Sequence, residues 1–205
     1  MLNLRYHLFL VSLLPFIAIH LSLILSIQND FLAFCYPYVD GCYSISRAAR
    51  QPYSIIIFKI LMITSAGLLF FLWQRIFNKE KNKSPILIGK IGSLFLVIYV
   101  IALGNDGFIY EFMRRIGVFI FYIFTLTSQW IFTFSQSIKK AKFSININLL
   151  KFTSFSQILL FILAIPFFLI IKNDGSIENI FEWWITLFIT IWFFVNFIYY
   201  KKNDV

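Results

Sequence analysis

Charged residues are scarce in this chain of 205 residues. Lys, Arg, Asp and Glu together make up 13% of it, whereas 60% of the residues are hydrophobic and the mean hydropathy is +0.82. So few polar side chains cannot cover the surface of a soluble fold of this length. The composition therefore excludes a soluble globular protein and indicates an integral membrane protein.

Histidine is also rare, with two residues in the whole chain. His7 and His20 both lie near the N-terminus, away in sequence from the charged residues discussed below. No Ser or Cys has the surroundings expected of an activated nucleophile. We therefore expect no cofactor and no metal, and the sequence favours a non-enzymatic protein.

Long apolar segments are what the chain has in abundance. A membrane-spanning helix needs about 20 apolar residues. Six segments meet this requirement, at residues 8–27, 53–73, 86–103, 109–134, 152–171 and 180–200. Because the connections are short, we predict an all-α fold in which residues 1–205 form a single domain of six transmembrane helices. The longest connection is an external loop at residues 28–52.

The positive charges predict the orientation of this bundle. If the segments alternate in direction, one side of the membrane collects twelve basic and two acidic residues, and the other side six basic and seven acidic residues. By the positive-inside rule, both termini are cytoplasmic, in a plasma, inner or internal membrane. The basic residues lie in short loops beside membrane segments and form no nucleic-acid-reading module, so we expect no nucleic acid partner.

The two cysteines of the chain, Cys35 and Cys42, both fall in the loop at 28–52. The charge pattern places this loop on the non-cytoplasmic side, where a disulfide persists. We predict a disulfide between the two residues. Zinc binding is the alternative, although zinc requires more ligands than two cysteines supply.

Charged side chains also gather where the apolar segments reach the non-cytoplasmic side. Such side chains are costly inside a bilayer unless they find partners or line a wet cavity. The candidates for a site that binds a lipid headgroup are Arg47, Arg50, Lys59, Glu111, Arg114, Arg115 and Glu182. The alternative for the arginines is that they extend to the membrane interface without any binding role.

Two of the predicted helices carry a polar stripe. Thr125, Gln129 and Thr133 follow Glu111 and Arg115 at helical spacing in the fourth segment. Thr186 and Thr190 follow Glu182 in the same way in the sixth. We expect both stripes to face the interior of the bundle, either as part of a site or as hydrogen-bonding contacts between helices. Trp183, Trp184 and Trp192 are predicted to be interfacial anchors.

Several short motifs occur in a familiar order. These are Pro37-Tyr38-Val39 and Ser44-Ile45-Ser46 in the loop, Arg114 three residues before Gly117, and Glu182-Trp183 at the last helix. In their order and spacing they resemble the DRAM/Sfk/Frag family, which includes the N-terminal domain of CWH-type proteins. The resemblance implies six helices with cytoplasmic termini and a role connected with autophagy, phospholipid asymmetry or remodelling of glycosylphosphatidylinositol lipids. Arg114 stands where members of this family often have histidine.

Three functions are compatible with the sequence. The first is a non-enzymatic protein that binds or organises membrane lipids through an anionic headgroup. The second is a lipid-remodelling enzyme in which Glu182 or Glu111 acts as a general base. The third is a subunit that binds a membrane-protein partner or a second copy of itself, in which Glu111 pairs with Arg115 and Lys59 pairs with Glu182. We favour the first because five cations exceed what the two acids need for pairing.

Overall fold

The computed structural model describes residues 3–77, 83–139, 145–169 and 175–201, and all regular structure in these residues is helical. Six of the helices are long and apolar enough to cross a membrane. They are α1 (Leu4–Gln28), α4 (Ser54–Ile76), α5 (Ser84–Ala102), α6 (Phe108–Lys139), α7 (Ile145–Leu169) and α8 (Ser176–Lys201). The predicted all-α fold with six long apolar helices is therefore confirmed.

The bounds of the helices differ from the predicted ranges where polar residues extend a helix. Helix α7 begins at Ile145 rather than near residue 152, and α6 continues to Lys139 rather than ending near residue 134. Asn146 and Asn148 in the first turn of α7 lower its local hydropathy. Because backbone hydrogen bonds do not require apolar side chains, a count of apolar length misses such turns.

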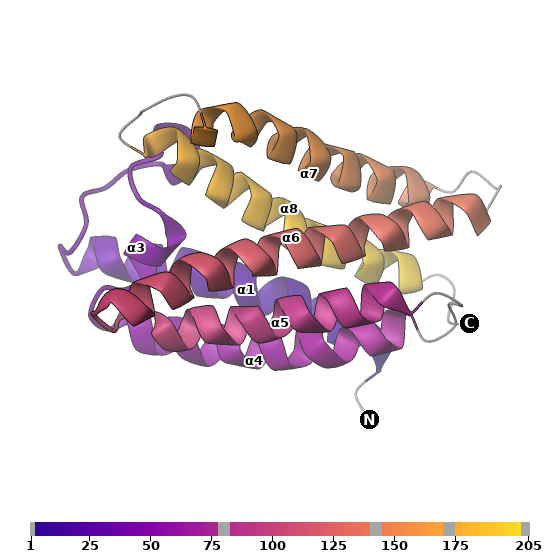
Figure 1. Ribbon diagram of the computed structural model, residues 1–205, viewed down its shortest axis with the longest axis horizontal. Coiled ribbons are helices and arrows are strands. Elements are labelled where there is room, and N and C mark those ends of the chain that lie inside the picture. Colours follow the sequence, from indigo (N-terminus) through magenta and orange to yellow (C-terminus); the bar gives the residue numbers. More distant parts are fainter. Residues whose placement is uncertain (1–2, 78–82, 140–144, 170–174, 202–205) are drawn as a thin grey trace.

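The helices form a closed bundle. Each long helix contacts the next one in chain order, in the sequence α1, α4, α5, α6, α7 and α8. Helix α8 in turn contacts α1. Helix α1 begins and α8 ends at the same end of this bundle, whereas residues 29–53 lie at the opposite end (Figure 1). We call residues 29–53 the cap, and that end the cap end. The cap was predicted only as a loop, but it contains the short helices α2 (Pro37–Asp40) and α3 (Ile45–Ala49).

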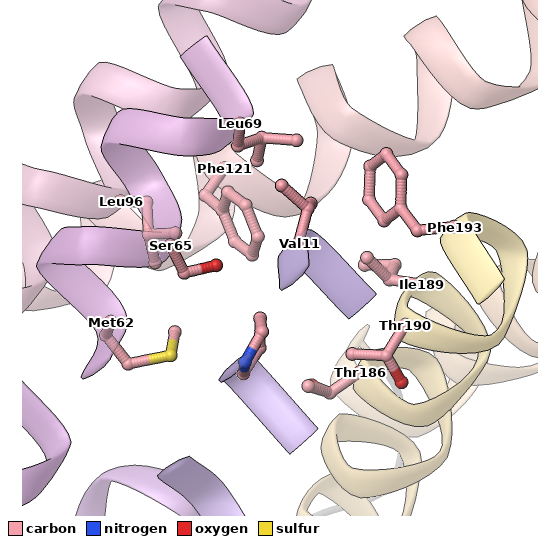
Figure 2. A pocket seen from close by; sticks show the side chains of 11 residues that line it. Val11, Met62, Ser65, Leu69, Leu96, Phe121, Thr186, Ile189, Thr190 and Phe193 are labelled. Carbon is pink, nitrogen blue, oxygen red and sulfur yellow. The ribbon is translucent and has the colours of Figure 1, made fainter. Parts of the chain in front are cut away.

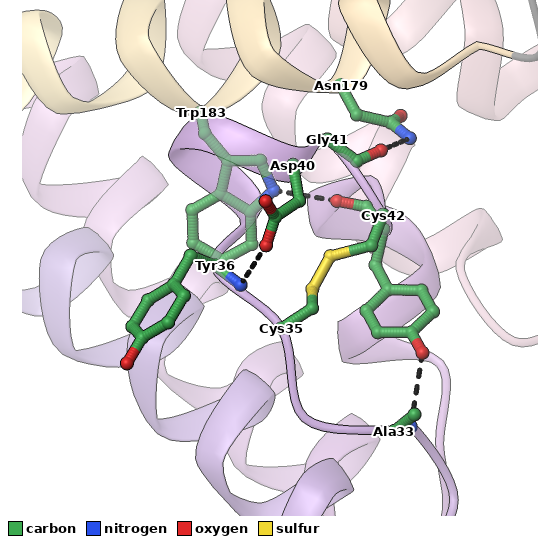
Figure 3. Close-up of a disulfide and its surroundings, with 9 residues drawn as sticks. Ala33, Cys35, Tyr36, Asp40, Gly41, Cys42, Asn179 and Trp183 are labelled. Atoms are coloured by element: carbon green, nitrogen blue, oxygen red, sulfur yellow. Dashed lines mark hydrogen bonds between the residues drawn. A yellow bond between two sulfur atoms is a disulfide. The ribbon is translucent and has the colours of Figure 1, made fainter.

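The cap is closed by a disulfide between Cys35 and Cys42, whose Cα atoms are 6.6 Å apart. Helix α2 lies between the two cysteines, and the Asp40 carboxylate accepts a hydrogen bond of 2.9 Å from the backbone N–H of Tyr36 (Figure 3). The predicted disulfide is thus confirmed. Because both sulfur atoms are consumed by it, neither remains as a thiolate ligand for zinc.

Side chains from the beginning of α8 hold the cap in place. Asn179 donates a hydrogen bond to the backbone oxygen of Gly41 at 2.7 Å, and the Trp183 indole donates to that of Tyr43 at 2.8 Å (Figure 3). Gly41 has a φ of +60°, and a Cβ at this position would collide with the backbone oxygen of Ser176. The cap therefore sits directly on the N-terminal turns of α8.

The prediction that tryptophans of α8 are interfacial anchors is wrong for two of them. Trp183 and Trp192 are both fully buried. Trp192 donates a hydrogen bond of 2.9 Å to the Thr133 hydroxyl, so it joins α8 to α6. Trp184 is more exposed, but its indole donates to the backbone oxygen of Tyr38 in the cap at 3.0 Å. These indoles face protein partners because buried N–H groups require acceptors.

Helices α5 and α6 pack closely through glycine. A Cβ on Gly117 would lie 2.9 Å from the Cβ and from the backbone nitrogen of Tyr99, and a Cβ on Gly92 would lie 3.2 Å from the Cβ of Phe124. Small residues of this kind let two membrane helices approach each other. The part of α6 nearest the cap end is therefore held against α5.

In its other half, α6 is held by hydrogen bonds to α7 and α8. The side-chain N–H groups of Gln157 donate to Gln129 at 2.8 Å and to the backbone oxygen of Phe188 at 3.1 Å, and the Trp130 indole donates to Gln157 at 3.2 Å. Gln129 donates in turn to the backbone oxygen of Ile189 at 3.3 Å. The prediction that Thr125, Gln129 and Thr133 face the interior is confirmed, since all three are buried.

Candidate functional site

A polar cavity of about 310 Å³ lies at the cap end, between α3, α5, α6 and α8. This volume is at the lower end of the ~300–1,000 Å³ range typical of pockets for small ligands. The lining combines three arginines, two glutamates and three uncharged residues. They are Arg50, Arg114, Arg115, Glu111, Glu182, Ser46, Tyr99 and Val118.

Five of the seven predicted headgroup-binding residues line this cavity, and Arg47 and Lys59 do not. Arg47 is exposed, and its guanidinium lies 5.2 Å from the centre of the Tyr43 ring. Lys59 is half-buried on α4, where its Nζ atom lies 3.5 Å from the backbone oxygen of Ile101. Lys59 therefore interacts with the end of α5 and does not line the cavity.

Glu111 and Arg115 form an ion pair of 2.5 Å, one helical turn apart on α6. The side chains are 51% and 79% exposed, respectively, so this wall of the cavity reaches the surface of the bundle. An exposed pair one turn apart contributes only about 0.3–0.5 kcal/mol to stability. The predicted pairing is confirmed, and both side chains remain accessible to a ligand.

Arg114 is fixed by the end of the neighbouring helix. Its Nη1 atom donates to the backbone oxygens of Asn105 at 2.6 Å and Ala102 at 3.3 Å. The last carbonyl groups of a helix lack partners within the helix, and the helix dipole favours a cation beside them. The half-buried Arg114 thus caps α5 while it lines the cavity.

Glu182 is half-buried and projects from α8 toward the cap. Its carboxylate accepts a hydrogen bond of 3.3 Å from the backbone N–H of Ile45, at the beginning of α3. The ion pair between Lys59 and Glu182 that the structural alternative requires does not form, and within the described ranges Glu182 has no ion pair at all. The cavity therefore contains a carboxylate without a cationic partner.

A second, apolar cavity of about 30 Å³ lies one helical turn deeper. Figure 2 shows side chains of α4 and α8 on opposite sides of it, with Val11 of α1 between them. Leu96, Phe121 and Thr186 line it, each about one turn along its helix from a residue that lines the polar cavity. A cavity of this size holds only about two or three water molecules, so an acyl chain does not fit in it.

Sequence reasoning missed the uncharged residues of the polar cavity, namely Ser46, Tyr99 and Val118. Ser46 belonged to a motif of the family resemblance but was given no role. Tyr99 lies in an apolar helix, where a tyrosine is usually a packing residue or an interfacial anchor. This buried tyrosine reaches the cavity because of the way α5 is oriented about its own axis. No residue spacing in the sequence indicates that orientation.

No family model matches this chain, and neither a curated protein nor a solved structure matches it. The resemblance to the DRAM/Sfk/Frag family therefore stays a prediction that rests on its short motifs. The function is consequently argued from the chemistry of the polar cavity.

Proposed function

We propose that this protein is a non-enzymatic membrane protein that holds the phosphate-bearing headgroup of a lipid in the polar cavity. The observation that carries the proposal is the gathering of Arg50, Arg114 and Arg115 around one cavity of about 310 Å³. Arginine presents a planar fork of N–H groups that matches phosphate oxygens. With two glutamates in the same lining, the cavity has an excess of positive charge.

The proposed orientation places the cap outside the cytoplasm and both termini inside. Two independent observations support it. The basic residues concentrate on the side opposite the cap. The cap itself carries the Cys35–Cys42 disulfide, which persists in an oxidising compartment. The lipid would therefore belong to the outer leaflet.

A lipid fits the surroundings of the cavity better than a soluble anion does. Among the described residues, no hydrogen bond joins the stretch 108–121 of α6 to α7 or α8. Helices α6 and α7 also diverge toward the cap end (Figure 1). On this stretch Phe108, Ile109 and Phe119 are 84%, 69% and 62% exposed. The acyl chains would leave the cavity past Phe119, toward the middle of the membrane, since the apolar cavity has no room for them.

A structural role for the same charges is the second candidate. It is favoured by the contacts of Arg114 with the end of α5 and by the ion pair between Glu111 and Arg115. In that case the protein would act by binding a membrane-protein partner or another copy of itself. This alternative does not explain why positive charge is in excess in the lining of the cavity around Arg50.

Lipid binding by purified protein tests the proposal. Delipidated protein is titrated with phospholipid and with uncharged diacylglycerol, and bound lipid is counted by native mass spectrometry. Loss of one charge-assisted hydrogen bond costs about 1.5–3 kcal/mol, so Arg50→Gln should weaken phospholipid binding by roughly 10-fold or more. Arg47→Gln is the matched control, because Arg47 is exposed in α3, three residues before Arg50, but does not line the cavity. Equal binding of both lipids by the wild type would contradict the proposal.

A further inference from the structure

The polar cavity contains charges of both signs, and its two carboxylates differ in their partners. Glu111 is engaged by Arg115 at 2.5 Å, whereas the carboxylate of Glu182 has only the backbone N–H of Ile45, at 3.3 Å. Bringing an ionised carboxylate out of bulk water is costly unless a countercharge compensates it. Within the described part of the chain, no basic side chain lies within ion-pair distance of Glu182, although three arginines line the same cavity.

The arginines around the cavity retain hydrogen-bonding capacity. Arg50 uses its Nε atom for the backbone oxygen of Ser46 at 3.2 Å, and Arg114 uses only Nη1 for its two backbone contacts. A guanidinium has five N–H donors, so each side chain can also bind an anionic oxygen. The cavity thus combines donors for an anion with an acceptor that lacks a cation.

The occupant that satisfies both needs carries an anion and a cation a few atoms apart. A primary ammonium is a compact cation with three N–H donors that a carboxylate can accept. A quaternary ammonium has no N–H group and is usually held by several aromatic faces. The lining contains a single aromatic residue, Tyr99, so it is suited to the primary ammonium.

We infer that the polar cavity binds a zwitterionic headgroup of the phosphoethanolamine type, with the phosphate on the arginines and the ammonium on Glu182. This inference rests on the proposed function and narrows it to one class of headgroup. It also gives Glu182 a role that an anionic headgroup alone would not explain, because an anion near an unpaired carboxylate would be repelled.

Binding of three lipid probes to wild type and variants tests the inference. Purified protein is placed in nanodiscs of dioleoylphosphatidylcholine that contain increasing amounts of phosphatidylethanolamine or phosphatidylglycerol, and lipid enrichment around the protein is measured. The wild type should prefer phosphatidylethanolamine over both other lipids by 10-fold or more. Glu182→Gln should abolish this preference, because a neutral amide cannot form an ion pair with an ammonium.

Glutamine at position 182 retains an acceptor for the Ile45 N–H, so the cap should stay docked and the melting temperature should change little. Glu178→Gln is the matched control, since Glu178 lies one turn earlier on α8 and does not line the cavity. Soluble glycerophosphoethanolamine is added as a competitor in a separate arm. Competition shows that the headgroup alone binds. Failure of competition while phosphatidylethanolamine is still enriched shows that the acyl chains are also required.

The outcomes separate the two proposals. If phosphatidylglycerol binds as well as phosphatidylethanolamine and Glu182→Gln affects them equally, the zwitterionic headgroup is excluded while phosphate binding stands. If no phospholipid is enriched over its bulk fraction and Arg50→Gln changes nothing, the proposed function itself is excluded.

Discussion

The carboxylate of Glu182 in α8 accepts a hydrogen bond from the backbone N–H of Ile45, which lies 137 positions earlier in the chain. This contact connects the cap to the wall of the polar cavity. Ile45 begins α3, the helix that contains Ser46 and is followed directly by Arg50, and both of these residues line the cavity. This hydrogen bond therefore contributes both to the position of the cap and to the shape of the cavity.

Replacing Glu182 by alanine should destabilise the protein more than replacing it by glutamine. Alanine leaves the buried N–H of Ile45 without an acceptor, which costs about 1–3 kcal/mol, whereas glutamine retains an oxygen at the same place. Thermal unfolding in detergent, followed by tryptophan fluorescence, measures the difference. Equal melting temperatures for Glu182→Ala and Glu182→Gln would show that the contact does not support the cap.

Gly117 should be intolerant of any side chain. A Cβ at this position would lie 2.9 Å from Tyr99, so Gly117→Ala should force α5 and α6 apart and cost about 1–3 kcal/mol, as overpacking usually does. Gly67→Ala is the matched control, because nothing lies within 4 Å of a Cβ there. Chemical denaturation of the two variants provides the comparison. A loss of stability of the same size in both variants would exclude the packing explanation.

The disulfide of the cap should contribute to stability and report orientation. Closing a loop between residues 35 and 42 is expected to stabilise the fold by about 2–3 kcal/mol through the entropy of the unfolded chain. The variant with serine at positions 35 and 42 should therefore melt at a lower temperature than the wild type under non-reducing conditions. A difference of the same size should appear when the wild type is reduced.

The same cysteines test the proposed orientation in intact cells. After mild reduction, a membrane-impermeant maleimide should label Cys35 and Cys42 from outside. Labelling from the cytoplasmic face of sealed membrane vesicles would place the cap in the cytoplasm and contradict the orientation.

The cap should loosen at high pH through Tyr38. Burial raises the pKa of Tyr38 from its ordinary value of 10.0 to about 12, and its hydroxyl lies 2.9 Å from Nε2 of His20. Because the folded protein holds this proton more tightly than the unfolded chain does, the stabilisation is present below pH 10 and is lost as the pH rises toward 12. The fluorescence of Trp183 and Trp184, whose rings lie 5.3 Å from that of Tyr38, should report the change. Identical pH profiles for the wild type and Tyr38→Phe would contradict this assignment.

Much of the architecture could be predicted from the sequence because hydropathy and length determine which segments can cross a membrane. The inward faces of α6 and α8 were also predictable, since polar residues such as Gln129 and Thr186 recur at helical spacing there. Helix α4, by contrast, is apolar all round, so nothing in its sequence indicates which way Lys59 turns. For that reason the sequence did not indicate that Lys59 contacts the end of α5 and does not line the polar cavity.

The short helices of the cap were not predictable for a different reason. Helices α2 and α3 have four and five residues, too few to be stable alone. They depend on contacts with distant residues of α8, such as Asn179 and Trp183. The polar cavity arises from the same docking, so its uncharged lining could not be identified from local sequence.

An experimental structure in phosphatidylethanolamine nanodiscs tests the central claim most directly. The account predicts density for a headgroup in the polar cavity, with its phosphate in hydrogen-bonding range of Arg50 and Arg115 and its acyl chains passing Phe119 of α6. A cavity that contains only water, with lipid confined to the outer surface of the bundle, would contradict it.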